Sequence, residues 1–188
     1  MAKVVVQMNV SVDGFFEGPD GDIGWHQVDN ELHGHFNDEL RQMAEFHEGR
    51  RTYELMESFW PTADQDPEAD APMAEFAGIW RDTPKVVYSR TLATVGPNAT
   101  LVREVDPEEI RRVRTRPGGD IAVGGAELAA AFARLDLVDE YWIYVHPVLV
   151  GAGRRMFPAD GDRHPMRLAG TRTFGNGVVL LRHERARD

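Results

Sequence analysis

The 188-residue chain contains no cysteine. Disulfide bonds, thiol nucleophiles and cysteine-based metal sites are therefore excluded. The sequence also has no apolar stretch of the length that a membrane-spanning helix needs. Its N-terminal apolar run is too short for a signal peptide. These absences predict a soluble, cytoplasmic protein.

Positive charge is scarce. The sequence has 21 lysines and arginines against 31 aspartates and glutamates, which gives a formal net charge of −10. This balance disfavours nucleic acids and anionic membranes as partners, because both need a basic surface. A bound anion would have to be held by a local basic cluster. The length and the 42% hydrophobic content are typical of one globular domain, expected over residues 1–188.

Several catalytic signatures are missing. There is no GxGxxG, no HExxH and no GxSxG, so the sequence favours neither a standard Rossmann domain, nor a zinc protease, nor a serine hydrolase. Seven histidines are present. His33 and His35 are two residues apart and would face different directions on a helix. We expect no metal site.

Hydrophobic patterns predict strands alternating with helices, followed by strands alone. The expected strands are 4–10, a short one within 44–49, 86–89, 100–103, 120–124, 138–150, 166–173 and 178–184. The expected helices are 31–46, 52–59, 73–80, 107–114 and 126–135. Residues 61–72 are rich in Asp, Ala, Pro and Glu and are predicted to be a mobile surface insertion. The order predicts an α/β fold with a mixed, mostly parallel central sheet, flanking helices and an antiparallel C-terminal part.

Three segments stand where a strand ends and a helix or turn begins. They are Gly49-Arg50-Arg51-Thr52, Ser89-Arg90 and Gly124-Gly125-Ala126-Glu127-Leu128. Unpaired N–H groups and the helix dipole favour anions at helix starts, glycine permits close approach, and arginine grips phosphate with two parallel bonds. Together the segments suggest a cradle for a phosphate-rich dinucleotide. Taken singly, each is also explained without a ligand, as a helix start with Thr52 as its cap and solvated arginines, or as a tight turn.

Three further runs are Ser11-Val12-Asp13-Gly14, Val87-Tyr88 before Ser89, and the residues from Val138 to Gly153. Together with these runs, the three segments resemble the dihydrofolate reductase-like superfamily. The similarity is closest to the reductase domain of the bifunctional riboflavin-biosynthesis deaminase/reductase. It covers essentially the whole chain and implies a dihydrofolate reductase-like fold that binds NADPH.

The resemblance also implies residue roles. Residues 50–52 would flank the phosphates beside Gly49, Ser89 and Arg90 would read the adenosine 2′-phosphate, and residues 124–128 would meet the pyrophosphate and the nicotinamide half. The loop from Asp13 to Trp25 would close over the nicotinamide, with Asp13, Ile23 and Trp25 in the substrate pocket.

True dihydrofolate reductases carry an acidic residue shortly after a tryptophan in this loop. Here Asp29 is the candidate for a proton-donating or ring-binding role, and it is equally placed to cap the next helix. We therefore expect an NADPH-dependent reductase of a small pterin- or pyrimidine-like substrate that works by hydride transfer. The alternatives are a non-catalytic nucleotide-binding or sensor protein, and a fold with no ligand.

Large apolar and aromatic groups alternate on both faces of the strand 138–150, including Tyr141, Trp142, Ile143 and Tyr144. One face would pack on the chain's own helices, and the other would form an exposed apolar patch. Such patches favour interfaces, so a homodimer built on the strand 138–150 and its C-terminal neighbours is expected. Alternatively, the chain's own segment 166–184 covers that face.

Overall fold

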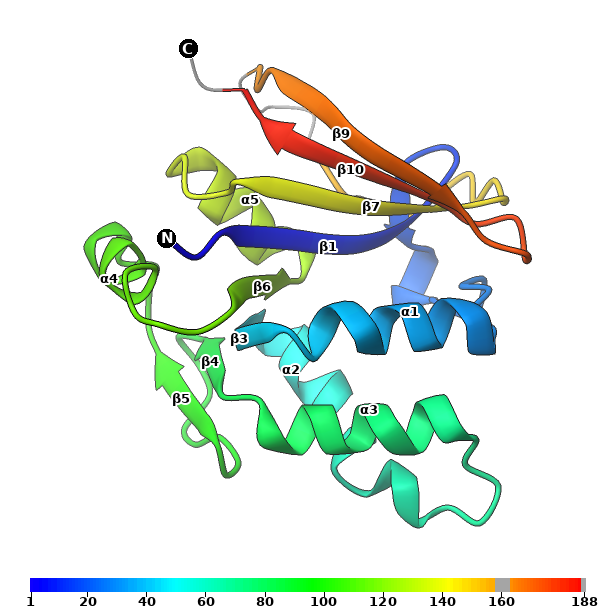
Figure 1. Ribbon diagram of the computed structural model, residues 1–188, viewed down its shortest axis with the longest axis horizontal. Helices are drawn as coiled ribbons and strands as arrows, with labels where there is room; N and C mark the ends of the chain where they lie inside the picture. Colours follow the sequence, from blue (N-terminus) through cyan, green and yellow to red (C-terminus); the bar gives the residue numbers. More distant parts are fainter. Residues whose placement is uncertain (158–162, 187–188) are drawn as a thin grey trace.

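A computed structural model of the protein describes residues 1–157 and 163–186. Its centre is an eight-stranded sheet with the order β5-β4-β3-β6-β1-β7-β10-β9 (Figure 1). The strands are β1 (Val4–Ser11), β3 (Met43–Gly49), β4 (Lys85–Tyr88), β5 (Ala99–Val102), β6 (Asp120–Gly124), β7 (Glu140–His146), β9 (Met166–Thr173) and β10 (Val179–Arg185). The helices are α1 (Asn30–Leu40), α2 (Arg50–Glu57), α3 (Ala71–Asp82), α4 (Pro107–Val113) and α5 (Ala126–Arg134).

The strands from β5 to β7 run parallel, and β10 and β9 add an antiparallel end. This confirms the predicted mixed sheet. The carboxyl ends of parallel strands meet at one edge, so the ends of β3, β4 and β6 lie together with the starts of α2 and α5. The three predicted segments belong to these ends.

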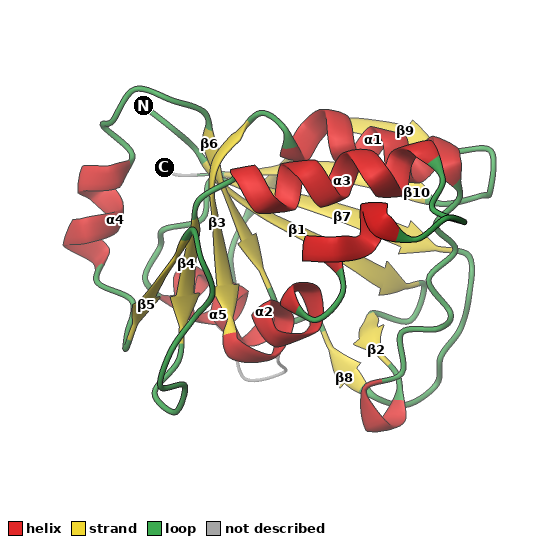
Figure 2. Ribbon diagram, turned by 90° about the horizontal axis from the view of Figure 1, so that it is seen from below, coloured by secondary structure: helices red, strands yellow, loops and turns green. Residues whose placement is uncertain are grey.

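Helices cover both faces of the sheet. Figure 2 shows α1 and α3 running along one face. Alternate side chains of β1 explain the two layers, since Val4, Val6 and Met8 pack in a cluster with α5 residues such as Phe132. Val5 packs in the cluster of α1 and α3. A strand buried on both faces is typical of parallel sheets.

The predicted helix 31–46 ends early, at Leu40. Met43 begins β3 and pairs in register with Asp120 of β6. The side-chain amide of Gln42 donates a 2.9 Å hydrogen bond to the carbonyl of Asp38, one of the last acceptors of the helix. The apolar spacing that predicts a longer helix runs across this turn into the strand.

The exposed apolar face predicted for the strand 138–150 is absent from the described chain, so that prediction is wrong. β7 is shorter, and both of its faces are buried. Tyr141 and Ile143 pack in the α5 cluster, whereas Trp142 and Tyr144 pack in the α1 and α3 cluster. β9 and β10 continue the sheet beside β7 and do not lie across its face.

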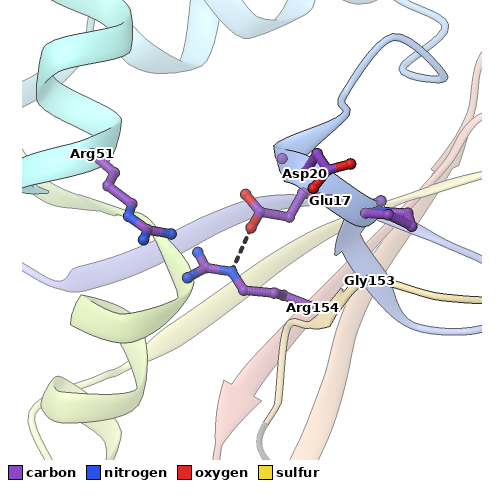
Figure 3. A pocket seen from close by; sticks show the side chains of 8 residues that line it. Glu17, Asp20, Arg51, Gly153 and Arg154 are labelled. Carbon is purple, nitrogen blue, oxygen red and sulfur yellow. Dashed lines mark ion pairs between the residues drawn. The ribbon is translucent and has the colours of Figure 1, made fainter.

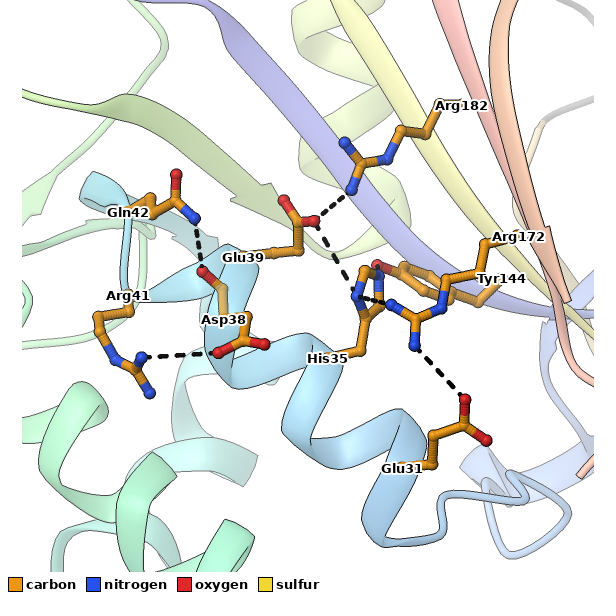
Figure 4. A network of polar contacts seen from close by, with 9 residues as sticks. All are labelled: Glu31, His35, Asp38, Glu39, Arg41, Gln42, Tyr144, Arg172 and Arg182. Atoms are coloured by element: carbon orange, nitrogen blue, oxygen red, sulfur yellow. Dashed lines mark hydrogen bonds and ion pairs between the residues drawn. The ribbon is translucent and has the colours of Figure 1, made fainter. Parts of the chain in front are cut away.

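A polar network fixes α1 on this end of the sheet (Figure 4). His35 is buried, and burial lowers its pKa. Its Nδ1 accepts from Arg172 of β9, and its Nε2 lies 3.2 Å from the hydroxyl of Tyr144 of β7. Glu39, one turn further along α1, pairs with Arg182 of β10. These contacts fix α1 against the face of the sheet formed by β7, β10 and β9.

The segment predicted as a mobile insertion, 61–72, contains most of a short 3-10 helix, η2 (Trp60–Gln65), and the start of α3. Ala63 is buried, and Asp64 accepts two hydrogen bonds of 2.9 and 2.7 Å from Arg81 of α3. A second, two-stranded sheet joins β2 (Phe15–Glu17) to β8 (Arg154–Arg155). No helix within the described ranges is long and apolar enough to cross a membrane.

Candidate functional site

A cavity of about 940 Å³ opens at the carboxyl edge of the parallel strands. Its walls include β1, the ends of β3, β4 and β6, the first turns of α2 and α5, and side chains of α1 and α3. All of the predicted cofactor-binding residues line it: Gly49, Arg50, Arg51, Thr52, Ser89, Arg90, Gly124, Gly125, Ala126, Glu127 and Leu128. Of the predicted substrate-pocket residues, Ile23 lines the cavity.

The start of α2 differs from the prediction in one respect. Gly49 is the N-cap and forms no side-chain cap, so Thr52 lies inside the helix. The threonine hydroxyl lies close to Gly125, where a Cβ atom would lie 2.6 Å from its Oγ1. Arg50 and Arg51 are both exposed in the first turn, and Arg50 pairs with Glu54 at 3.4 Å. The first turn of α2 thus presents free backbone N–H groups and two guanidinium groups.

The start of α5 repeats this arrangement. Gly125 is its N-cap, again without a side-chain cap, and has a φ of 92°. Glycine is the residue that adopts this conformation at low cost. Gly124 precedes it at the end of β6, where an added Cβ would meet only ordinary van der Waals contacts, the nearest 3.5 Å away. Two helix starts therefore open into one cavity.

The turn after β4 is built by Ser89. Its buried hydroxyl accepts from the N–H groups of Thr91 and Leu92, at 3.2 and 3.0 Å. Arg103, just after β5, donates to the carbonyls of Ser89 and Leu92 at 2.8 Å each. Arg90 and Arg103 both line the cavity. Sequence reasoning missed Arg103, although its position after a strand parallel to β4 was the available signal.

Asp13 and Trp25 shape the loops around the cavity and are not among its lining residues. Asp13 accepts from the hydroxyl of Ser11 and from the N–H groups of Val150 and Gly151, at 2.6, 3.1 and 2.8 Å. These hydrogen bonds, the one from Ser11 foremost, lower the pKa of Asp13 to about 2. Asp13 thus ties the loop after β1 to the segment after β7.

Trp25 packs edge-on against His26 and His146, with ring centroids 4.3 and 5.7 Å away. His146 is fully buried at the end of β7, and burial lowers its pKa to about 4. Its Nδ1 accepts from the N–H of Gln27 at 3.1 Å, which leaves the proton on Nε2 to be donated to Asn9 of β1 at 2.9 Å. The buried imidazole therefore holds the loop against the sheet.

Asp29 occupies the cap position. Its Oδ1 accepts from the N–H of Leu32 at 2.9 Å, at the start of α1. The residue is exposed and is not among those that line the cavity. This geometry matches the capping role that the sequence allowed.

A smaller cavity of about 560 Å³ adjoins the first and shares Glu17, Arg51 and Arg154 with it. Figure 3 shows the guanidinium groups of Arg51 and Arg154 pointing toward each other across it. Arg154 of β8 pairs with Glu17 of β2 and, at 2.9 Å, with Glu127 of α5. Arg154 thus links β2 to the start of α5, and Arg51 of α2 lines the same smaller cavity.

Sequence reasoning also missed other polar residues of the large cavity, among them Glu48 and Gln7. Glu48 directly precedes Gly49, and Gln7 lies in the middle of β1. Burial raises the pKa of Glu48 to about 8. Strand alternation was the available signal, because it places Glu48 on the same face as the buried Phe46.

No group of three or more side chains that could hold a metal ion occurs in the part of the chain that the structure describes. The donors at the helix starts and strand ends of the cavity include the guanidinium groups of Arg50, Arg51, Arg90 and Arg103 and the backbone N–H groups of α2 and α5. Such donors suit phosphate oxygens.

Comparisons with known proteins agree with this architecture. A profile of the family described as RibD C-terminal domain matches residues 2–180. The uncharacterized protein YyaP of Bacillus subtilis is 31% identical over 180 residues, which cover 95% of this chain and 93% of YyaP.

Two solved structures share the fold. A candidate riboflavin biosynthesis protein from Shewanella sp. PV-4 has a TM-score of 0.74 and 19% identity, with 100% of both chains covered. The diaminohydroxyphosphoribosylaminopyrimidine deaminase/5-amino-6-(5-phosphoribosylamino)uracil reductase of Thermotoga maritima has a TM-score of 0.66 and 16% identity. That match covers 98% of this chain and 57% of the Thermotoga chain.

Proposed function

Because the chain belongs to the RibD C-terminal domain family, a family of reductases, we propose that it is an NADPH-dependent reductase of a small pterin- or pyrimidine-like substrate. The reaction is hydride transfer to a carbon–nitrogen or carbonyl double bond. The reduced nicotinamide supplies the hydride when it is bound. The chain binds and orients the two reactants, excludes water and supplies a proton.

One contrast between the helices carries this proposal. Aspartate side chains cap α1, α3 and α4, through Asp29, Asp70 and Asp106. The two helices that open into the cavity, α2 and α5, start at Gly49 and Gly125 without a side-chain cap. No side chain of the described residues caps their first-turn N–H groups, and the helix dipoles favour an anion there. A pyrophosphate fits between two such helix starts.

Arginines complete the nucleotide site. Arg50 and Arg51 extend from the first turn of α2 beside the phosphate position. Arg90 and Arg103 lie at the turn after β4, in the position proposed for the adenosine 2′-phosphate. Ser89 holds this turn through its own hydroxyl, so in the proposal it positions Arg90.

The substrate half lies on the α1 and α3 side of the sheet. The apolar side chains that line this half of the cavity are Leu40, Met56, Phe76 and Trp80. Flat apolar walls with a few polar groups suit a planar heterocycle, because the ring buries its faces while its edge forms hydrogen bonds. This supports the pterin- or pyrimidine-like substrate class.

The test is NADPH oxidation measured against a panel of pterins, folates and pyrimidines. The proposal predicts that at least one member of the panel is reduced with one NADPH consumed for each ring. NADPH binding without oxidation by any member contradicts the proposal and favours the alternative of a nucleotide-binding sensor. If NADPH does not bind at all, both are wrong.

We also propose a homodimer, formed through the C-terminal neighbour β9 and not through the buried faces of β7. β9 is an edge strand whose residues are nearly all exposed, and Met166 and Leu168 are exposed to 41% and 54%. An edge strand of this kind offers unpaired backbone groups to a second copy. Light scattering should give twice the chain mass of 21.1 kDa, and a mass of one chain contradicts the dimer.

A further inference from the structure

Glu48 is a buried acid that faces the substrate half of the cavity. It is 6% exposed and lines the cavity on the same face of β3 as Phe46, which packs in the α1 and α3 cluster. Its Oε2 is buried without a hydrogen-bond partner among the described residues. A buried carboxyl with an unsatisfied oxygen is costly, so such a group points to a role.

Gln7 of β1 and Glu48 of β3 lie on either side of β6. Gly124 of β6 pairs with Glu48 of β3. Val123 pairs with Val6 of β1, so the next residue along each strand sets Gly124 level with Gln7. The two side chains thus flank a residue that has none, with their Cα atoms about 10 Å apart. Oε1 of Glu48 lies 3.8 Å from the position that a Cβ on Gly124 would take, and Oε1 of Gln7 is a second buried oxygen without a partner in the described chain.

The charges around Glu48 do not ionise its carboxyl group. Lys85 of β4 favours ionisation, but its ammonium group donates to the carbonyls of Trp80 and Thr83. Glu57 of α2, which accepts from the indole N–H of Trp80, opposes ionisation. Burial has the largest effect, and the pKa of Glu48 is raised to about 8. The side chain is therefore a neutral acid at pH 7.

We propose that Glu48 is the proton donor of the reduction, and that with Gln7 it binds the polar edge of a heterocycle lying over Gly124. This inference rests on the proposed function. The substrate class that it specifies is a neutral ring with a reducible C=N bond whose nitrogen faces Glu48. A ring N–H or amino group of the same edge donates to Oε1 of Gln7.

The proton and electron balance is complete with a reduced nicotinamide as the reductant. A hydride carries two electrons from the nicotinamide to the carbon of the C=N bond. The nitrogen takes the proton from the carboxyl of Glu48, so C=N becomes CH–NH and the nicotinamide is oxidised. Glu48 is left as a carboxylate and regains its proton from water once the product leaves.

Other titratable groups fit this role less well. Asp29 caps α1 and is not among the residues that line the cavity. His26 does line it, but burial lowers its pKa, so the imidazole is neutral at pH 7. Its buried Nε2 has no partner within the described residues and is suited to accept a hydrogen bond from the substrate.

The test compares Glu48→Gln with Glu45→Gln, the same change on the same strand. Glu45 is not among the cavity-lining residues, and its hydrogen bond with His47 lowers its pKa. First, the free proteins are labelled with ¹³C at the glutamate carboxyl groups and titrated by NMR. We expect a resonance with a midpoint near pH 8 that is missing only from Glu48→Gln. If the resonance assigned to Glu48 titrates below pH 6, the proposal is wrong.

The second measurement uses single turnovers of NADPH with whichever ring of the panel is reduced. Glu48→Gln should bind NADPH as wild type does but turn over about 100-fold more slowly or worse. It should also lose the decline in rate above pH 8, whereas Glu45→Gln should keep wild-type rates. Unchanged turnover in Glu48→Gln with the same pH profile would overturn the proposal. Failure of wild type to oxidise NADPH with any ring overturns the proposed function itself, which distinguishes the two failures.

Discussion

A Cβ atom on Gly125 would lie 2.6 Å from Oγ1 of Thr52, so the start of α5 and the first turn of α2 meet at a position that only glycine fits. The φ of Gly125, 92°, adds a second reason for glycine. The sequence suggests that this glycine makes room for a pyrophosphate. The structure shows that the fold itself requires it.

Gly125→Ala should therefore destabilise the protein by about 1–3 kcal/mol, with or without nucleotide. The neighbouring Gly124→Ala is the matched control, since its Cβ would meet only contacts of 3.5 Å or more. Urea denaturation measures both. The double variant Gly125→Ala/Thr52→Ala should regain the part of the free energy of unfolding that the contact between the new Cβ and Oγ1 of Thr52 costs. Equal stability of the two single variants would show that the contact with Thr52 is unimportant.

Asp29 should act as a cap and have no part in the chemistry. Asp29→Ala should lower the free energy of unfolding by about 1 kcal/mol, and Asp29→Asn should lose much less because asparagine also caps. Thermal denaturation and NADPH turnover are measured on both variants. A large loss of turnover in Asp29→Asn, with stability kept, would instead return Asp29 to the catalytic role.

His146 should make the protein less stable in mild acid. Its pKa is about 4 in the folded protein and about 6.5 in the unfolded chain, so the unfolded chain binds an extra proton between these values. The free energy of unfolding therefore falls as the pH drops from about 6.5 to 4, by up to about 1.4 kcal/mol per pH unit. Denaturation curves at several pH values should show a shallower fall for His146→Gln. Identical slopes would contradict the assignment.

Glu48 should have the opposite dependence. Its pKa is raised on folding from 4.5 to about 8, so the folded protein binds the extra proton between these values and loses stability as the pH rises through them. Glu48→Gln removes this dependence. Its melting temperature should exceed that of wild type at pH 8.5, and the gain should shrink toward pH 4.5. A constant difference across that range would mean that Glu48 is ionised in the folded protein.

Much of the fold follows from local sequence. The strands β6 and β9 have the bounds that the sequence predicts. Glycines flank β6 on both sides, and Pro165 directly precedes β9. The cavity-lining segments also follow, since the ends of parallel strands must share one edge. The end of α1 does not, because the apolar spacing continues into β3 and the register with β6 decides the boundary.

The side-chain roles depended on contacts between distant segments. Asp13 was expected in the substrate pocket, but its carboxylate is used by backbone N–H groups 137 and 138 residues away. Glu48 is the buried acid of the cavity lining, and its environment comes from α2 and β4 as well as from its own strand. Sequence spacing alone does not show which of several carboxylates the fold will bury.

The central claim is that the cavity holds NADPH, and differential nucleotide binding tests it most directly. Fluorescence titrations of NADPH and NADH are made with wild type, Arg90→Ala and Arg167→Ala. The last variant removes an arginine from the far edge strand β9 and so has the same net charge as Arg90→Ala. We expect wild type to bind NADPH more tightly than NADH, and Arg90→Ala to lose about 10- to 100-fold for NADPH with little change for NADH. Arg167→Ala should match wild type. Absence of binding for both nucleotides, or an equal loss for both in Arg90→Ala, would contradict the account.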